Sequence, residues 1–149
     1  MTIRDADPTD AATLRDLHRR SSYVWEEDRA QLDAHPDVFG VAPGALDARW
    51  TRVAVADGGG PTGFATVIPR DDGEYILEDL FVEPELMRGG IGRALVEDAA
   101  ARAIAAGATS LSVVAAARTQ PFYERLGFVL QREAPTRFGP ALRLVRTLP

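Results

Sequence analysis

The chain shows two hydrophobic periods, one typical of helices and one typical of strands. Helical spacing puts Leu14 and Leu17 on one face with Ser21, and it recurs in a short segment that Pro36 closes. The helical spacing predicts helices over residues 9–20, 26–34, 90–106 and 119–126. Alternation predicts strands over residues 49–56, 62–69, 74–82 and 141–148. A short buried strand is expected over residues 110–115, and further short strands over residues 2–4 and 128–132.

The order of these elements predicts an α/β chain of the α+β type with a mixed sheet. The turn sequences DGGGP and DDG join strands 49–56, 62–69 and 74–82 into an antiparallel meander. Helix 90–106 then separates strand 74–82 from strand 110–115. A strand, helix, strand unit of this kind forms a parallel pair with a right-handed crossover. We therefore expect a mostly antiparallel sheet that contains one parallel pair.

Strand 74–82 is mostly apolar on both faces but carries two adjacent acids, Glu78 and Asp79. A strand that is covered on both faces belongs in the middle of a sheet. Because neighbouring side chains of a strand point to opposite faces, both carboxylates are expected on largely buried sides unless a bulge realigns them. Burying an unpaired carboxylate costs on the order of several kcal/mol, so we expect each acid to be paired, hydrated or functional.

A glycine-rich junction follows this strand. Pro84 stops the strand, and Gly89, Gly90 and Gly92 free the backbone where the next helix begins. The N–H groups of a first helical turn lack intrahelical acceptors and lie at the positive end of the helix dipole. The junction is therefore suited to bind a phosphate group.

Two familiar kinds of phosphate-binding loop do not fit this junction. A nucleoside triphosphate loop needs Lys and then Ser or Thr after the last glycine, whereas Gly92 is followed by Arg93 and Ala94. A dinucleotide fingerprint needs a third glycine, whereas position 95 is Leu95. A pyrophosphate cradle in an α/β chain remains.

The composition narrows the classes of function. With 149 residues, of which 46% are hydrophobic, the chain is expected to form a single domain over residues 1–149. The absence of cysteine excludes a thiolate metal site, and with two histidines we expect no metal; His18 is interpreted as a helix residue rather than a ligand.

The net charge of −5 argues against nucleic acid as a partner and mildly favours cationic substrates. Without an apolar run of membrane-spanning length, we expect no membrane partner and a cytoplasmic protein.

Two segments resemble the GNAT superfamily of acyl-CoA-dependent N-acetyltransferases. LEDLFVEPELMRGGIGRALVE is similar to the acyl-CoA-binding motif of that family, usually Gln/Arg-x-x-Gly-x-Gly/Ala, and PFYERLGF is similar to its later helix and strand. The chain departs from the pattern at Met87, which occupies the Gln/Arg position beside Arg88, and at Ala116, where many members have asparagine. The resemblance covers nearly the whole chain. It implies a sheet of about seven strands, about four helices and a splayed parallel pair at the acyl-CoA site.

The resemblance also implies an activity, namely transfer of an acetyl group from acetyl-CoA to a primary amine by direct attack in a ternary complex. Tyr123 would protonate the leaving thiolate. Glu78 would be the first candidate for the base that deprotonates the amine, with Asp79 second and a water chain as a further alternative. The residues expected to contact the coenzyme are Leu80, Phe81, Val82, Met87, Arg88, Gly89, Gly90, Ile91, Gly92, Arg93 and Phe122.

The acceptor is expected near residues 23–28. Tyr23 and Trp25 would wall a pocket, and Glu26 or a following acid would attract an ammonium group, although core aromatics beside a solvated helix start explain the pattern equally well. Polyamine, aminoglycoside, amino acid and peptide N-terminus all fit as small-molecule or peptide partners. Two other hypotheses stay open: a non-catalytic acyl-CoA sensor or accessory domain, and an interaction domain with a degenerate cradle. Exposed strand edges after Phe128 would permit a homodimer.

Overall fold

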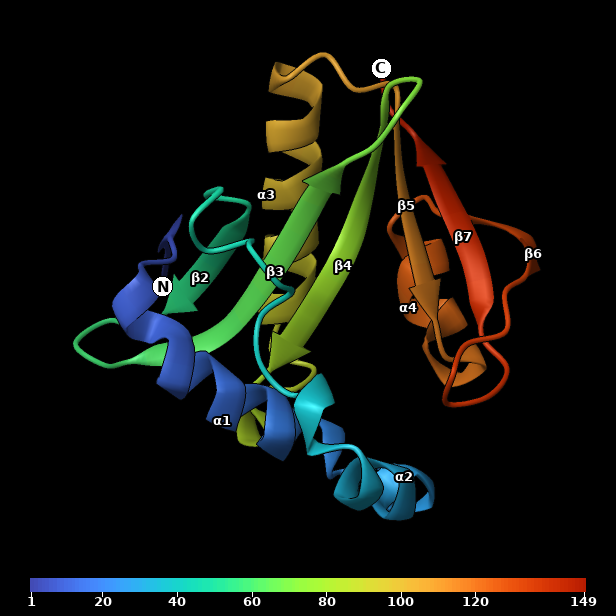
Figure 1. The fold of residues 1–149 in the computed structure, drawn as a ribbon. Helices are drawn as coiled ribbons and strands as arrows, with labels where there is room; N and C mark the ends of the chain where they lie inside the picture. The colour runs from blue at the N-terminus through green and yellow to red at the C-terminus, as the bar shows by residue number, and fades with distance from the viewer. The chain divides into compact units, whose positions relative to one another are not determined.

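The computed structural model describes all residues from Met1 to Pro149 (Figure 1). The chain contains four α-helices and seven strands, with short 3-10 turns between several of them. The helices are α1 (Ala11–Ser22), α2 (Arg29–Ala34), α3 (Ile91–Ala105) and α4 (Gln120–Arg125). The strands are β1 (Thr2–Asp5), β2 (Thr51–Val55), β3 (Pro61–Pro69), β4 (Glu74–Val82), β5 (Ser110–Ala115), β6 (Val129–Glu133) and β7 (Leu142–Thr147).

The strands form one seven-stranded sheet in the order β1-β2-β3-β4-β5-β7-β6. The pairs β1–β2, β2–β3, β5–β7 and β6–β7 are antiparallel, whereas β4 and β5 are parallel. This arrangement confirms the prediction of a mostly antiparallel sheet of seven strands with one parallel pair. Every predicted helix and strand is present, and the boundaries of β4 and β5 are those that the sequence predicted.

The parallel pair is joined only where the two strands begin. Its register runs through Glu74–Ser110, Tyr75–Leu111 and Ile76–Ser112. Beyond that point β4 continues to Val82 and β5 continues to Ala115 without further pairing between them. The expected splayed parallel pair is therefore confirmed.

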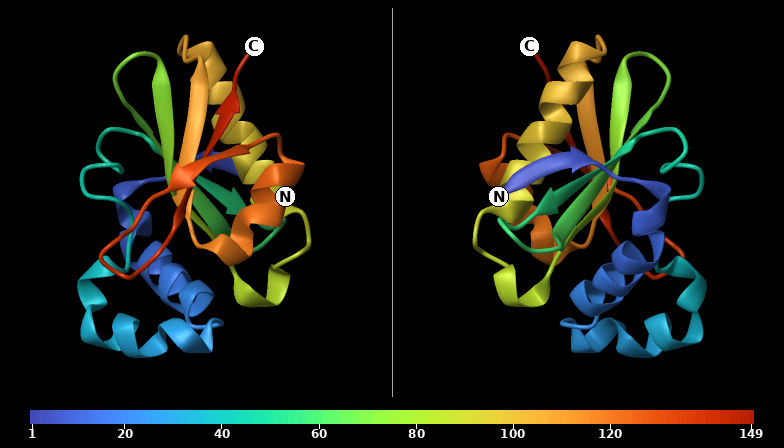
Figure 2. Two further views of the ribbon diagram at one scale, coloured as in Figure 1. Left: turned by 90° about the vertical axis from the view of Figure 1, so that its right-hand side faces the viewer. Right: turned by 90° about the vertical axis from the view of Figure 1, so that its left-hand side faces the viewer.

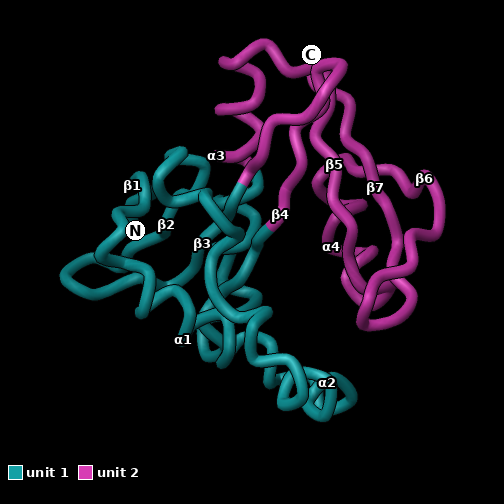
Figure 3. Tube along the Cα trace, viewed as in Figure 1, with its two compact units in different colours: residues 1–66, 79–96 teal, residues 67–78, 97–149 magenta.

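The chain divides into two compact units, coloured separately in Figure 3. Unit 1 contains Met1–Thr66 and Asp79–Val96, and unit 2 contains Val67–Glu78 and Glu97–Pro149. Strands β3 and β4 and helix α3 contribute residues to both units. The expectation of a single domain over residues 1–149 stays a prediction.

In unit 1, two helices cover opposite faces of the strands. Leu14 and Leu17 of α1 pack with Val53 of β2 and Phe64 of β3 in a buried cluster, as their helical spacing predicted. The first turn of α3 instead approaches Gly63, the neighbour of Phe64 in β3. Because neighbouring strand residues point to opposite faces, α1 and the start of α3 lie on opposite sides of β3, as Figures 1 and 2 show.

In unit 2, strands β5 and β7 form the interior, and β6 is the edge strand of the sheet. Leu111 of β5 and Leu144 of β7 are fully buried, whereas all five residues of β6 are exposed. Arg143 of β7 forms an ion pair with Glu74 of β4. Helices α3 and α4 both end before a glycine with a φ of 87°, Gly107 and Gly127, which is the stop that the sequence predicted.

Two expectations need correction. The first helix begins with a 3-10 turn at Pro8–Asp10 rather than as a continuous helix from residue 9, because Asp7 caps that turn by accepting from the N–H of Thr9 at 2.9 Å. Glu78 is exposed, whereas the sequence pattern predicted a largely buried side for both acids of β4; only Asp79 is buried. The pairing between β4 and β5 ends at Ile76, two positions before Glu78, so no paired residue of β5 stands beside Glu78 to cover its side chain.

Candidate functional site

The glycine segment, residues 83–93, links β4 to α3 through two unusual backbone conformations. A 3-10 turn at Pro84–Leu86 follows the strand, and α3 begins at Ile91. Between them, Arg88 and Gly90 have φ values of 69° and 91°, both in the left-handed region. An added Cβ at Gly90 would meet nothing within 4 Å. Glycine is therefore required at position 90 by its φ angle and not by lack of space.

Most backbone N–H groups of this segment have no acceptor in the chain. Met87 and Gly89 use their N–H groups within the turn, donating to the carbonyls of Pro84 at 3.4 Å and Leu86 at 3.2 Å. The N–H groups of Arg88 and of residues 90–93 donate to no backbone carbonyl, and Ala94 is the next residue that does, at 3.0 Å to Gly90. These free donors stand at the positive end of a helix of 15 residues, the arrangement that favours an anion.

Two cations flank these donors. Arg88 and Arg93 are exposed, and neither guanidinium forms an ion pair with an acid of the chain. By contrast, Arg20 of α1 is tied to Glu83 at the start of the segment by two hydrogen bonds of 2.7 and 2.8 Å. That pairing lowers the pKa of Glu83 and raises the pKa of Arg20. The unpaired positive charges of Arg88 and Arg93 therefore belong to the same segment as the free N–H groups.

The last residues of β4 present a second set of backbone groups. Glu83 donates its N–H to the carbonyl of Thr62 at 2.8 Å, so the backbone at this position points toward β3. Backbone groups alternate in direction along a strand, and those of Leu80 and Val82 therefore point away from β3. Since the ladder with β5 ended at Ile76, no strand partner occupies that side. Leu80, Phe81 and Val82 are all half-buried.

The two acids of β4 have different surroundings. Asp79 is buried, with 8% of its surface exposed, and its Oδ2 accepts a hydrogen bond from the N–H of Ala42 at 3.0 Å. This bond fastens the loop after Phe39 to β4 inside unit 1. Glu78, one residue earlier, is exposed. The predicted need for a partner is thus met at Asp79 by a backbone donor that no sequence pattern indicated.

His18 lies between the same loop and β4. Its ring stacks on Phe81 with centroids 3.7 Å apart, and its edge meets Phe39 at 5.4 Å. Its Nδ1 lies 3.1 Å from both the amide nitrogen and the carbonyl oxygen of Gly40. Burial, with a smaller contribution from the nearby Arg15, lowers the pKa of His18. His18 is therefore a packed helix residue, as the sequence indicated, and its neutral form is favoured.

Tyr123 and Phe122 belong to unit 2. Tyr123 is the buried residue of α4, and its ring makes edge contacts with Phe122 at 5.0 Å and with Phe128 at 5.4 Å. Burial raises the pKa of Tyr123 well above its ordinary value of 10. The phenol is therefore neutral across the physiological range and holds a proton that it can donate.

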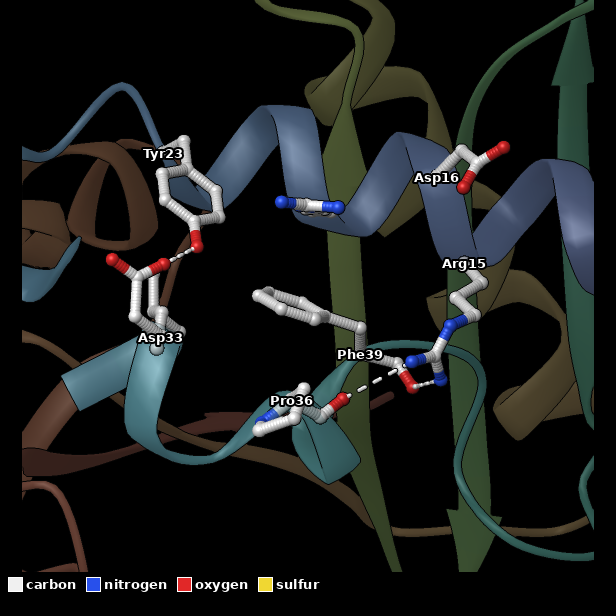
Figure 4. A pocket seen from close by; sticks show the side chains of 8 residues that line it. Arg15, Asp16, Tyr23, Asp33, Pro36 and Phe39 are labelled. Atoms are coloured by element: carbon white, nitrogen blue, oxygen red, sulfur yellow. Dashed lines mark hydrogen bonds between the residues drawn. The ribbon is translucent and has the colours of Figure 1, made fainter. Parts of the chain in front are cut away.

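The predicted acceptor residues do not share one cavity. A surface hollow of about 150 Å³ in unit 1 is lined by Tyr23, whereas Trp25 and Glu26 are exposed and lie outside that lining. Figure 4 shows the hydroxyl of Tyr23 pointing to Asp33 and Arg15 reaching across to the carbonyls of Pro36 and Phe39, both at 3.3 Å. The remaining lining residues are Asp16, Arg19 and Leu32.

Sequence reasoning missed Gly63, the close neighbour of α3. Its interior position in β3 was the available signal, because a glycine inside a strand often marks close approach of another backbone.

No cluster of His, Asp and Glu side chains in the chain could hold a metal ion. None of its helices combines the length and the apolar character needed to cross a membrane.

The fold is that of solved acetyltransferase structures. A GCN5-related N-acetyltransferase from Rhodopseudomonas palustris superposes with a TM-score of 0.79 and 22% identity, covering 99% of this chain and 95% of the other. PaiA N-acetyltransferase from Thermoplasma acidophilum, solved with coenzyme A, superposes with a TM-score of 0.74 and 17% identity, covering 98% of each chain. Nourseothricin acetyltransferase is 29% identical with a TM-score of 0.62, covering 66% of this chain and 65% of that enzyme, which is less than two thirds of its length.

Sequence comparison identifies the family. The family model described as acetyltransferase (GNAT) domain matches residues 49–130, which include β4, the glycine segment and α4. The chain belongs to the GNAT acetyltransferase family. A comparison with curated protein sequences finds no match.

Proposed function

We propose that the chain is an acetyl-CoA-dependent N-acetyltransferase that acetylates a primary amine of a small molecule or peptide. The observation that carries this proposal is the family match over residues 49–130. The amine would attack the acetyl carbon directly while both substrates are bound. A carbon–nitrogen bond forms, the carbon–sulfur bond breaks, the amine loses a proton, and the sulfur leaves as a thiolate that is then protonated.

The free backbone donors support acetyl-CoA as the acyl donor. The pyrophosphate would accept hydrogen bonds from the N–H groups of Arg88 and residues 90–93, with the side chains of Arg88 and Arg93 adding unpaired positive charge. The pantetheine arm would pair as an added strand with the backbone groups of Leu80 and Val82 that point away from β3. In this proposal Met87 and Gly89 shape the turn, and Phe122 supplies an aromatic contact.

A base is needed because an alkylammonium has a pKa near 10 and cannot attack until it loses a proton. Glu78 is the better candidate, since an exposed carboxylate can accept a proton from the amine and pass it to water. Asp79 is the second candidate, but one of its oxygens already accepts from Ala42. We propose that Asp79 mainly holds the loop after Phe39, and that Glu78 or a water chain ending at it removes the proton.

Tyr123 would stabilise the leaving sulfur. A thiol has a pKa of about 8.5, so full proton transfer from a phenol whose pKa burial has raised is uphill. A hydrogen bond from the neutral hydroxyl to the developing thiolate carries no such cost and still lowers the barrier to carbon–sulfur cleavage. Hydrogen bonding is therefore the larger part of the proposed role, with protonation completing the step.

For the acceptor, Tyr23, Trp25 and Glu26 remain the proposed substrate-binding residues. Trp25 and Glu26 are exposed, and Glu26 stands in an acidic turn with Glu27 and Asp28 that would attract an ammonium group. An amine with a second positive charge, such as a polyamine or an aminoglycoside, suits this turn and the net charge of −5. Amino acids and peptide N-termini belong in the same assay panel.

A non-catalytic acyl-CoA sensor is the second candidate function. The observations that favour it are the raised pKa of Tyr123 and the hydrogen bond that occupies Asp79, because both weaken the acid–base chemistry that turnover needs. A sensor would use the same cradle and would bind acetyl-CoA without consuming it.

One experiment separates these functions. Purified protein is incubated with acetyl-CoA and a panel of amines, thiol release is followed spectroscopically, and acetyl-CoA binding is measured by calorimetry. We expect binding together with amine-dependent thiol release for at least one class of amine. Binding without release for any amine would favour the sensor, and absence of both would reject the acetyltransferase proposal.

A further inference from the structure

Gly63 is closely surrounded by its neighbours in unit 1. It lies in β3 on the face that meets α3. A Cβ built on it would be 3.0 Å from the carbonyl oxygen of Phe81, 3.1 Å from Cδ1 of Leu95 and 3.2 Å from Cγ2 of Ile91. All these distances are shorter than ordinary van der Waals contact, so no side chain larger than hydrogen fits without displacing a neighbour.

The requirement for glycine at this position comes from space alone. The φ angle of Gly63 lies outside the left-handed region that disfavours side chains, in contrast to the 91° of Gly90. The two glycines therefore serve different needs: Gly90 permits a backbone turn that other residues resist, and Gly63 permits close packing of two elements.

The neighbours of Gly63 belong to the two parts of the candidate cofactor site. Phe81 lies in β4 between Leu80 and Val82, whose outward backbone groups would pair with pantetheine. Ile91 is the first residue of α3, and its N–H is one of the free donors proposed for the pyrophosphate. Leu95 lies one turn later and is fully buried.

We propose that Gly63 is a positioning residue for acetyl-CoA: the missing Cβ sets the distance between β4 and the first turn of α3, and so the spacing of the two sets of backbone groups that bind the coenzyme. This inference rests on the proposed function. Gly63 has no contact with the ligand in this view and acts only through the backbone that it allows to approach.

The neighbours differ in how far they can move. The Phe81 carbonyl is part of the central strand, and Leu95 has no exposed surface, so both are held in place. Ile91 is half-buried at the free end of the helix and can move outward. A methyl group at position 63 would therefore shift the start of α3 by a few tenths of an ångström away from β4, carrying the free N–H groups with it.

The test is the affinity of Gly63→Ala for acetyl-CoA, measured by calorimetry at a temperature where circular dichroism shows every variant folded. We expect binding about 10-fold weaker than wild type, because displacements well under 1 Å are costly in preorganised sites. Gly60→Ala is the matched control, since Gly60 has no left-handed φ and nothing within 4 Å of an added Cβ. Val53→Ala controls for stability, because it removes buried volume from the α1 side of unit 1. Both controls should bind within about 2-fold of wild type.

A second-site variant tests the mechanism directly. Ile91→Leu removes the Cγ2 methyl group that lies 3.2 Å from the added Cβ. Gly63→Ala combined with Ile91→Leu should therefore bind more tightly than Gly63→Ala alone. If the single variant does not fold, the double variant is compared with Ile91→Leu and should bind more weakly than it, because the close contact with the Phe81 carbonyl remains.

The outcomes distinguish this inference from the function on which it rests. If wild type binds no acetyl-CoA, the proposed function fails and the positioning role fails with it. If wild type binds and Gly63→Ala binds equally well, the function stands and the positioning role is rejected. Equal losses in Gly63→Ala and Val53→Ala would also reject it, since general destabilisation would then be sufficient.

Discussion

The polar groups of the glycine segment in unit 1 and of helix α4 in unit 2 have opposite surroundings. The segment leaves the N–H groups of Arg88 and residues 90–93 without a partner in the chain, beside exposed arginines. Helix α4 instead buries the phenol of Tyr123 against Phe122 and Phe128. Free donors cost little in water and are ready for an anion, whereas a buried hydroxyl acts in a low-dielectric setting where one hydrogen bond is strong. The proposed binding segment and the proposed catalytic group therefore lie in opposite environments.

The largest effect is expected from Gly90→Glu. The new carboxylate adds negative charge and bulk at the free donors, so acetyl-CoA should bind roughly 100-fold more weakly or not at all. Binding is measured by calorimetry. Gly107→Glu is the matched control, because Gly107 has a similar φ of 87° and equally open surroundings at the other end of α3. Equal losses in both variants would show that backbone strain, and not the free donors, explains the result.

Tyr123→Phe tests the proposed role of the buried hydroxyl in α4. The substitution keeps the ring between Phe122 and Phe128 and removes only the hydroxyl, so we expect kcat to fall about 100-fold with little change in the KM for acetyl-CoA. Steady-state thiol release measures both constants. Tyr75→Phe makes the same chemical change on β4 and should retain activity. A wild-type kcat in Tyr123→Phe would leave the hydroxyl without a role in catalysis.

His18 is a buried titratable group of unit 1 that stacks on Phe81 of β4. Its folded-state pKa is lowered by burial, so its contribution to stability is present above the ordinary value of 6.5 and is lost as pH falls through the folded-state pKa. Urea unfolding from pH 8 to 5 should show stability falling toward acid by at most about 1.4 kcal/mol per pH unit for this one proton.

The two histidines of the chain allow an internal control for that measurement. His18→Asn should remove the slope near pH 6, whereas His35→Asn should keep it, because His35 is exposed. If the His18 variant retains the full pH dependence of stability, a group other than His18 causes it.

The smallest effect is expected from the ion pair between Arg20 and Glu83, which joins α1 to the glycine segment. Its side chains are 50% and 22% exposed, so the coupling in a double-mutant cycle with Arg20→Gln and Glu83→Gln should be about 0.5 kcal/mol. Since this pairing lowers the pKa of Glu83, the contribution should be present above its ordinary 4.5 and fade as pH falls. Arg146 and Glu97 provide a comparison pair in unit 2. A coupling of several kcal/mol would mean that the segment is held far more rigidly than its exposure implies.

Much of the fold could be predicted because local spacing reports local structure. The alternation of Glu74–Val82 and the short apolar segment Ser110–Ala115 predicted the boundaries of β4 and β5, and the turn glycines located the ends of α3 and α4. The parallel pairing of β4 with β5 followed from the helix between them. These features depend on residues close together in the chain.

The candidate site was predicted less completely because its surroundings come from distant segments. The sequence pattern placed both Glu78 and Asp79 on largely buried sides, and only the structure showed that Glu78 is exposed and Asp79 buried. Nothing in the pattern around Ala42 indicated that its N–H would bind Asp79, 37 residues away. Burial and hydrogen-bond partners are properties of the packed chain, and alternation alone does not encode them.

By itself, then, the sequence determined the order and period of the elements and the position of the glycine segment, because side-chain spacing and glycine act on the backbone locally. Only the tertiary structure decided which of the two acids of β4 is exposed and how little space surrounds Gly63. The space at Gly63 depends on how closely β3, β4 and α3 approach one another within unit 1, and that distance is set by packing.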